Sequence, residues 1–265
     1  MKKIFLFLFI AFELLASVIK SPLLTYDEDK KIATIKVNHA DVGMSGFIVH
    51  TIAPQHTSIL KNIEVSDFDK STQIATLKVS EFDGLKNNAL PSGKWKVQVG
   101  DNAVLAFGYT RSLLIAPTEK IYYRIAKSVK TQWLHPDLFT TILSFRGHPT
   151  PLKEDFIAMS NATSVGLVFI YLKQKVYTVD AKSFVILSIT DAPLVQDGVV
   201  LPFYSRVEEI DEAWWGEGND PLEAYEPHYF ELLALNNKTN KELYKNIKMQ
   251  GEEFADLLKN FEIKE

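Results

Sequence analysis

The chain has 265 residues, of which 46% are hydrophobic, and it contains no cysteine, which excludes disulfides, thiolate metal sites and a cysteine nucleophile. Its formal net charge of -4 argues against nucleic acid as a partner, because that binding depends on basic surfaces that neutralise phosphates. A chain of this length and hydrophobic content can form one large or two small domains.

The N-terminus has the pattern of a secretory signal peptide over residues 1–17. Met1-Lys2-Lys3 gives a short basic start, an apolar run reaches Ala16, and Ala16 and Ser17 supply small residues for cleavage. This run is shorter than the roughly 20 residues that a membrane-spanning helix needs, and no later stretch reaches that length. We expect an exported protein of the periplasm or cell surface with no membrane span after cleavage; an uncleaved anchor is the alternative.

Residues 26–113 predict a β-rich domain with a barrel-like or sandwich-like fold. Apolar and polar residues alternate at 33–37, 75–79 and 94–99, as they do in half-buried strands. Turn-forming sequences separate these runs at 41–43, 91–93 and 100–102. Several short strands at this spacing are typical of a small barrel or sandwich.

Residues 114–235 predict an α/β domain that begins with three helices. Thr118 is placed to cap the first helix. Pro136 and Gly147 are placed to begin and end the second. Thr150-Pro151 resembles the cap and first turn of a third.

The later part of this domain predicts strands, and the end of the chain predicts helix. The continuous apolar run at 165–172 is typical of a strand that is covered on both faces, with neighbours at 176–179 and 184–189 in a meander. Residues 236–265 form a polar helical segment, with a capping-box pattern at Thr239 and an interruption at Gly251. The expected fold class is therefore α+β, with a mixed sheet in the second domain.

No catalytic or metal-binding motif stands out. The histidines lack the spacing that places two metal ligands on one helix face, and the sequence has no glycine-rich phosphate loop. Ser58 and Lys61 match a Ser-x-x-Lys pattern, but the partner motifs of such enzymes are missing. We therefore predict no enzyme activity, no catalytic residues, no cofactor and no metal.

The acidic segment 208–228 contains Trp214 and Trp215 and carries no lysine or arginine. Its tryptophans and acids are consistent with an aromatic platform for a ligand, a cation site or a partner contact. The favoured interpretation is that both tryptophans cover the core while the acids are solvated, because paired tryptophans usually pack against something.

The C-terminal segment is rich in lysine, and most such lysines lie on a solvated helix face. They are also suited to a partner that recognises lysine. The candidate partner-binding residues are Lys245, Lys248, Lys259 and Lys264.

Several ordered stretches resemble a known family. They are Val42-Gly43-Met44-Ser45-Gly46-Phe47-Ile48-Val49, Leu114-Ile115-Ala116-Pro117 with Tyr122 and Ile125, Ser164-Val165-Gly166, Ser183-Phe184-Val185-Ile186-Leu187 and Phe203-Tyr204-Ser205-Arg206-Val207-Glu208-Glu209-Ile210-Asp211. In this order they resemble the N-terminal domain of the bacterial plasminogen-binding protein family, from about Ile35 to about Leu233. The resemblance implies a cell-envelope protein that captures host plasminogen through lysine recognised by kringle domains, with no catalytic residues.

The resemblance also implies a long charged tail that ends in lysine, whereas this sequence ends Ile263-Lys264-Glu265. We therefore expect a non-enzymatic surface or envelope protein whose lysine-dependent plasminogen binding is weak. Glu242 with Lys245, and Glu262 with Lys264, are the pairs expected to imitate a terminal lysine. The alternative is a structural or scaffolding protein of the periplasm that does not bind plasminogen.

Overall fold

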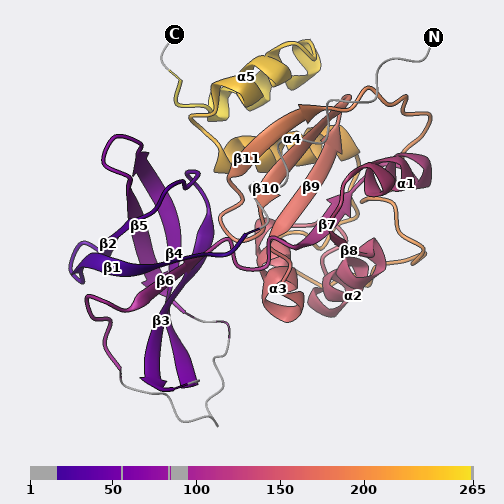
Figure 1. Cartoon of the computed structure of the whole chain (residues 1–265). Helices are drawn as coiled ribbons and strands as arrows, with labels where there is room; N and C mark the ends of the chain where they lie inside the picture. The colour runs from indigo at the N-terminus through magenta and orange to yellow at the C-terminus, as the bar shows by residue number, and fades with distance from the viewer. Residues whose placement is uncertain (1–16, 55, 83, 85–94, 264–265) are drawn as a thin grey trace. The chain divides into compact units, whose positions relative to one another are not determined.

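The computed structural model describes residues 17–54, 56–82, 84 and 95–263 (Figure 1). Residues 1–16 of the predicted signal peptide, and Lys264, lie outside this part. The described chain divides between Tyr109 and Thr110 into two compact units. One holds a closed β-barrel and the other a mixed sheet with helices, which confirms the predicted α+β class. No helix in the described ranges combines the length and the apolar character needed to cross a bilayer.

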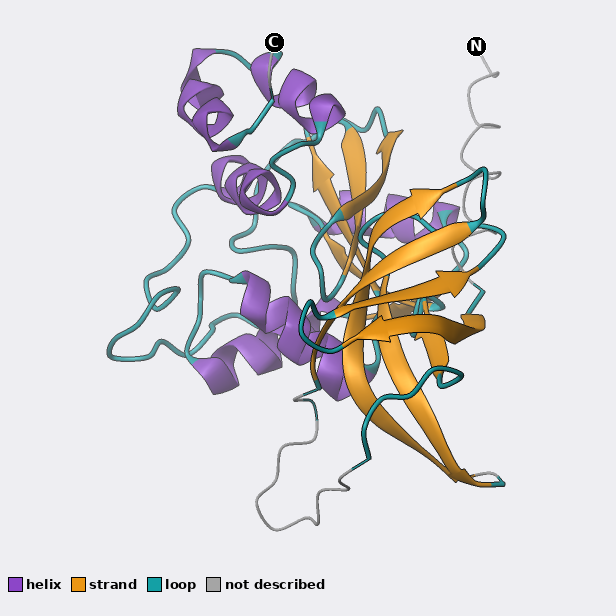
Figure 2. Ribbon diagram, turned by 90° about the vertical axis from the view of Figure 1, so that its left-hand side faces the viewer, coloured by secondary structure: helices purple, strands orange, loops and turns teal. Residues whose placement is uncertain are grey.

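The first unit is a six-stranded barrel in which all neighbouring strands are antiparallel. The strand order is β1-β2-β5-β4-β3-β6, and pairing of β6 with β1 closes the barrel. Figure 2 shows these strands as the long, twisted ribbons of this unit. The strands are β1 (Ile19–Asp27), β2 (Ile32–Lys36), β3 (Ser45–Ala53), β4 (His56–Asp69), β5 (Ile74–Glu81) and β6 (Asn102–Leu105). Strand structure thus begins before residue 26.

The barrel interior is filled by the alternating apolar residues that the sequence predicts. Ile35 of β2 and Leu77 of β5 are fully buried, as are the alanines that precede each of them by two positions. Gly46 on β3 allows β3 and β6 to approach closely, because a Cβ there would lie 2.1 Å from the carbonyl oxygen of Val104.

The strand predicted at 94–99 is wrong for residues 95–99, which belong to no strand. Asp101 Oδ2 accepts a hydrogen bond from the Gln98 backbone N–H at 2.8 Å, and the Asp101 N–H donates back to the Gln98 oxygen at 3.1 Å. This turn occupies backbone groups that a strand would pair with a neighbour, and it leaves Val99 65% exposed. The last barrel strand therefore begins only at Asn102.

The second unit is built on a five-stranded sheet with the order β11-β10-β9-β7-β8. Strand β7 runs parallel to β8 and β9, while β9, β10 and β11 form an antiparallel meander, as predicted. Every residue of β9 is buried, which agrees with a strand covered on both faces. The strands are β7 (Arg111–Ile115), β8 (Gln132–Leu134), β9 (Leu167–Leu172), β10 (Lys175–Asp180) and β11 (Ile186–Asp191).

Helices pack on this sheet and on each other. Helices α1 and α2 contact β7, α3 packs on α2, and α4 contacts β9. The last two helices stack on α4, as the yellow end of the chain shows in Figure 1. They are α1 (Glu119–Ser128), α2 (Pro136–Arg146), α3 (Lys153–Thr163), α4 (Tyr225–Asn236), α5 (Lys241–Lys248) and a 3-10 helix, η1 (Glu252–Asn260), that follows Gly251.

Two of the predicted helix starts are confirmed. Thr118 Oγ1 accepts the Ile121 N–H, and α2 runs from Pro136 to a left-handed residue at Gly147. Two others are shifted along the chain. The carboxylate of the fully buried Asp155 accepts the Leu152 N–H, so α3 begins after Leu152 instead of at Thr150-Pro151.

The start predicted from Thr239 is wrong by one residue. Asn240 caps α5, and its Oδ1 accepts the Leu243 N–H at 2.9 Å.

Candidate functional site

The candidate lysine surface is the solvent face of α5. Leu243 and Ile247 are fully buried against the core, while Lys241, Lys245 and Lys248 are exposed. Spacings of four and three residues place these three lysines on one side of the helix. The helix therefore presents a cationic face to solvent.

Asn237 fixes this helix to the sheet. Its side-chain Oδ1 accepts the Ile186 N–H at 2.7 Å, and its Nδ2 donates to the oxygens of Phe184 and Leu233 at 3.1 and 2.9 Å. All three bonds are buried, so the corner between α4 and α5 is held against β11. The lysine face consequently lies on an ordered part of the unit.

Other lysines of the segment are already paired with acids. Lys259 Nζ lies 2.6 Å from Asp256 Oδ1, and this hydrogen bond raises the pKa of Lys259 and lowers the pKa of Asp256. Lys238 Nζ lies 3.7 Å from Glu262 Oε1. These exposed pairs each place a cation beside a carboxylate. From the sequence, we expected that combination at Glu242 with Lys245 and at Glu262 with Lys264.

The pairing expected between Glu242 and Lys245 is not found among the described residues, where both side chains are exposed on α5. Lys248 instead places its Nζ 5.9 Å from the centre of the Tyr244 ring. The expected pair of Glu262 with Lys264 lies outside the described residues, and Glu262 is paired with Lys238.

The expectation that Trp214 and Trp215 cover the core is wrong. Their side chains are 94% and 81% exposed. Ile210 and Tyr225, on either side of them in the sequence, are buried and take the positions in the core. The tryptophans lie in the turn between these anchors, so the segment presents two indoles and its acids to solvent.

The carboxyl ends of the parallel strands β7 and β8 carry a network of polar and aromatic side chains. Asp137, in the first turn of α2, accepts hydrogen bonds from Ser205 Oγ and the Arg206 N–H at Oδ1, and from Arg206 Nε at Oδ2. Partial burial favours the neutral acid, but the bonds from Arg206 outweigh it and lower the pKa of Asp137.

Aromatic rings extend this network toward α1. The Tyr204 hydroxyl donates to Glu119 Oε1 at 3.2 Å, and burial raises the pKa of Tyr204. The ring of Tyr204 also contacts Tyr122 and His135. These bonds join residues 203–206 to α1 and α2. We call residues 203–206 the strap, because this stretch, which is part of the family resemblance, holds the two helices together.

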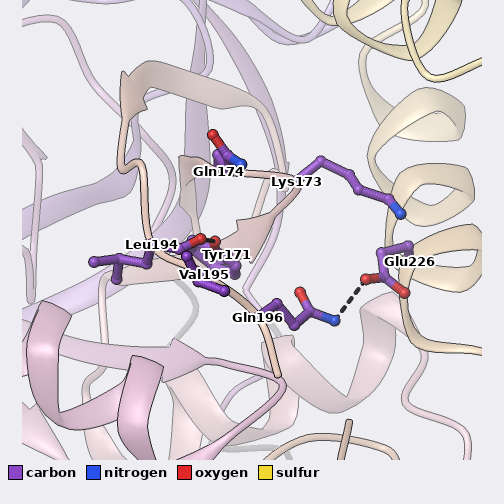
Figure 3. Close-up of a pocket in the computed structure, with 7 residues that line it drawn as sticks. All are labelled: Tyr171, Lys173, Gln174, Leu194, Val195, Gln196 and Glu226. Carbon is purple, nitrogen blue, oxygen red and sulfur yellow. Dashed lines mark hydrogen bonds between the residues drawn. The ribbon is translucent and has the colours of Figure 1, made fainter. Parts of the chain in front are cut away.

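A shallow pocket of about 330 Å³ opens beside the turn between β9 and β10. Figure 3 shows its lining of polar and apolar side chains, in which Gln196 Nε2 donates to Glu226 Oε1 at 2.8 Å. The Tyr171 hydroxyl donates to the Leu194 oxygen at 2.7 Å, so it is already engaged. The lining residues include no histidine, serine or cysteine.

Lys61 of the Ser-x-x-Lys pattern is paired with an acid. Lys61 on β4 lies 2.5 Å from Glu81 on the adjacent strand, so its ammonium is held in an ion pair. Among the described residues, no group of three histidine, aspartate or glutamate side chains is placed to hold a metal ion.

Comparison with known proteins identifies the family. Residues 18–233 match the family described as "Plasminogen-binding protein pgbA N-terminal". The chain belongs to this family. The match covers the barrel and the sheet, and ends within α4, before the lysine face of α5.

Two curated relatives carry the name Plasminogen-binding protein PgbA. Both come from Helicobacter pylori, strains J99 and 26695, and each is 28% identical to the chain over 195 residues, or 72% of the chain. The chain spans about four-tenths of their length, 42% and 41% respectively. No solved structure matches the chain.

Sequence reasoning missed the contacts of Asp137 with Arg206. The two residues are 69 positions apart in the sequence, and no short sequence motif links them. Asp137 follows the parallel strand β8, which was not predicted from the sequence, so its place at the carboxyl edge of the sheet, where ligand sites commonly lie, emerged only from the structure.

Proposed function

We propose that the chain is a non-enzymatic binding protein, exported to the periplasm or cell surface, that binds plasminogen weakly through lysine side chains. The observation that carries this proposal is family membership over residues 18–233, together with relatives that are named for plasminogen binding. The family is named for binding and not for catalysis, which supports the non-enzymatic part.

The geometry of α5 supports the proposal that lysine side chains contact plasminogen. A kringle site recognises a cation next to a carboxylate, and α5 exposes three lysines together with one acid, Glu242. Lys241, Lys245 and Lys248 share one solvent face, and Lys259 with Asp256 adds a cation beside a carboxylate. Because exposed ion pairs constrain side chains only slightly, such internal pairs imitate a terminal lysine poorly, and we expect low affinity.

The test is surface plasmon resonance of the full chain against immobilised plasminogen. The variant K241Q/K245Q/K248Q removes the lysine face without touching the buried Leu243 and Ile247. The matched control is K36Q/K70Q/K78Q, which removes the same charge from exposed lysines of the barrel. We expect binding to fall in the first variant and to persist in the control. Equal loss in both would indicate a nonspecific charge effect, and no loss in either would contradict the assignment to α5.

A further inference from the structure

The segment between Ile210 and Leu222 carries a surface feature that the lysine proposal does not use. Trp214 and Trp215 are 94% and 81% exposed, although tryptophan has one of the largest apolar surfaces of any residue. Folded proteins seldom leave adjacent large aromatic side chains in water, and exposed apolar surface of this kind marks interaction sites.

The backbone on both sides of the two indoles is fixed. The Ala213 N–H donates to the Gly147 oxygen at 3.0 Å, and Asn219 Nδ2 donates to the Ala213 oxygen at 3.3 Å. Beyond the turn, the Thr150 N–H donates to the Gly218 oxygen at 3.1 Å. A Cβ on Gly218 would lie 2.8 Å from the Thr150 oxygen, so this approach depends on glycine. The tryptophans are therefore displayed from a fixed turn, which lowers the entropy cost of binding.

The segment that carries the indoles is acidic, and Arg146, which precedes Gly147 beside Ala213, is paired with the buried Asp155. No lysine or arginine occurs between Arg206 and Lys238, and Arg206 is bound to Asp137. The exposed acids of this segment form no ion pair within the described part of the chain. They are Glu208, Glu209, Asp211, Glu212, Glu217, Asp220 and Glu223. A surface of this charge repels anionic lipid and nucleic acid and attracts a cationic partner.

We infer that Trp214 and Trp215 form a docking surface for an arginine-rich segment of a partner protein. A guanidinium is planar and weakly hydrated, so it stacks on an indole face while neighbouring carboxylates accept its N–H groups. An ammonium group lacks the flat face, and a metal ion finds no ligand in an indole. The charge of this surface is opposite to that of the α5 lysine face, so the two surfaces select different partners.

The test uses the full chain and a fluorescently labelled hexa-arginine peptide, with fluorescence anisotropy as the readout. We expect the peptide to bind more tightly than hexalysine, and a glutamine peptide of the same length not to bind. The variant W214A/W215A should raise the Kd at least about tenfold, since tryptophans at interfaces commonly contribute that much. The control W95A removes an exposed tryptophan of the barrel and should leave the Kd unchanged.

A second pair of variants separates stacking from charge. E212Q/E217Q should weaken binding and reduce its dependence on salt, whereas E28Q/D29N removes two exposed acids of the barrel and should have no effect. The inference is overturned if hexa-arginine does not bind, or if it binds W214A/W215A as tightly as the unmodified chain. Tryptophan-dependent binding to zwitterionic vesicles in place of the peptide, or tryptophan-dependent self-association of the chain, would also overturn it.

Discussion

The backbone N–H of Ala213 donates to the carbonyl oxygen of Gly147 at 3.0 Å, which joins the segment before the two tryptophans to the end of α2. Gly147 ends α2 with a φ of 71°, a left-handed conformation that favours glycine. A Cβ at this position would lie 2.5 Å from the Cβ of Ala213. Gly147 therefore ends α2 and also leaves room for Ala213, which precedes the two exposed tryptophans.

Gly147→Ala should destabilise the fold by about 1–3 kcal/mol, because the new methyl group adds a clash with Ala213 to the strain of a positive φ. The matched control is Gly216→Ala, where φ is 118° but nothing lies within 4 Å of the added Cβ. Urea unfolding followed by circular dichroism measures both. A loss in G147A that is no larger than the loss in G216A would contradict the packing argument.

The strap formed by residues 203–206 gives a second prediction. Asp137→Asn should lower the free energy of unfolding by about 1–2 kcal/mol, as expected for hydrogen bonds that involve a charged group. Arg206→Gln should lower it less, because the Arg206 side chain is exposed and its backbone N–H still donates to Asp137. The double variant should lose less than the sum of the two, because both changes remove the same interaction. A double-mutant cycle by urea unfolding measures this coupling. Strict additivity would show that Asp137 and Arg206 do not stabilise each other.

His228 gives a pH dependence with a defined sign. Burial lowers its pKa below 6.5, and the hydrogen bond to the Pro151 oxygen at 2.9 Å offsets this only in part. The unfolded chain therefore binds this proton more readily than the folded chain, so stability is full above about pH 6.5 and falls as the pH drops toward the lower folded pKa. His228→Gln keeps an N–H donor but cannot titrate. Unfolding free energies between about pH 7.5 and about pH 5.5 should fall more steeply in the unmodified chain than in H228Q. Equal slopes would show that His228 is not the group responsible.

Features set by short stretches of sequence were predicted well. Thr118 caps its helix, and Pro136 and Gly147 begin and end the next, because capping depends on residues within one turn. The barrel interior followed from period-two alternation at Ala33 and Leu77. In these cases the local signal and the tertiary structure agree.

The misses have two physical causes, which are local turn and cap hydrogen bonds at some sites and packing of other residues in the core at another. The alternation at 95–99 was overridden by the turn at Asp101, whose carboxylate also lies 2.7 Å from His50 Nδ1. Trp214 and Trp215 stay in solvent because Ile210 and Tyr225 occupy the core positions. The turn at Asp101 is local, since its bonds join residues three positions apart, whereas the burial of Ile210 and Tyr225 depends on packing with the rest of the second unit.

The end of the chain offers a direct test of how lysine is presented. In a version that stops at Lys264, the side-chain ammonium and the terminal carboxylate belong to one residue, which is the combination that a lysine-recognising site prefers. We expect this version to bind plasminogen more tightly than the chain ending in Glu265. A version that stops at Ile263 is the control and should not gain affinity. Identical binding by all three versions would remove Lys264 from the account and leave α5 as the proposed contact.

Competition with a free lysine analogue tests the central claim most directly. The full chain is passed over immobilised plasminogen in surface plasmon resonance, with the analogue added at increasing concentration and a matched amount of neutral salt as the control. The account predicts weak binding that the analogue abolishes while salt reduces it only slightly, because the analogue occupies the kringle sites that would receive lysine. Binding that persists at saturating analogue would contradict lysine-dependent capture of plasminogen by this chain.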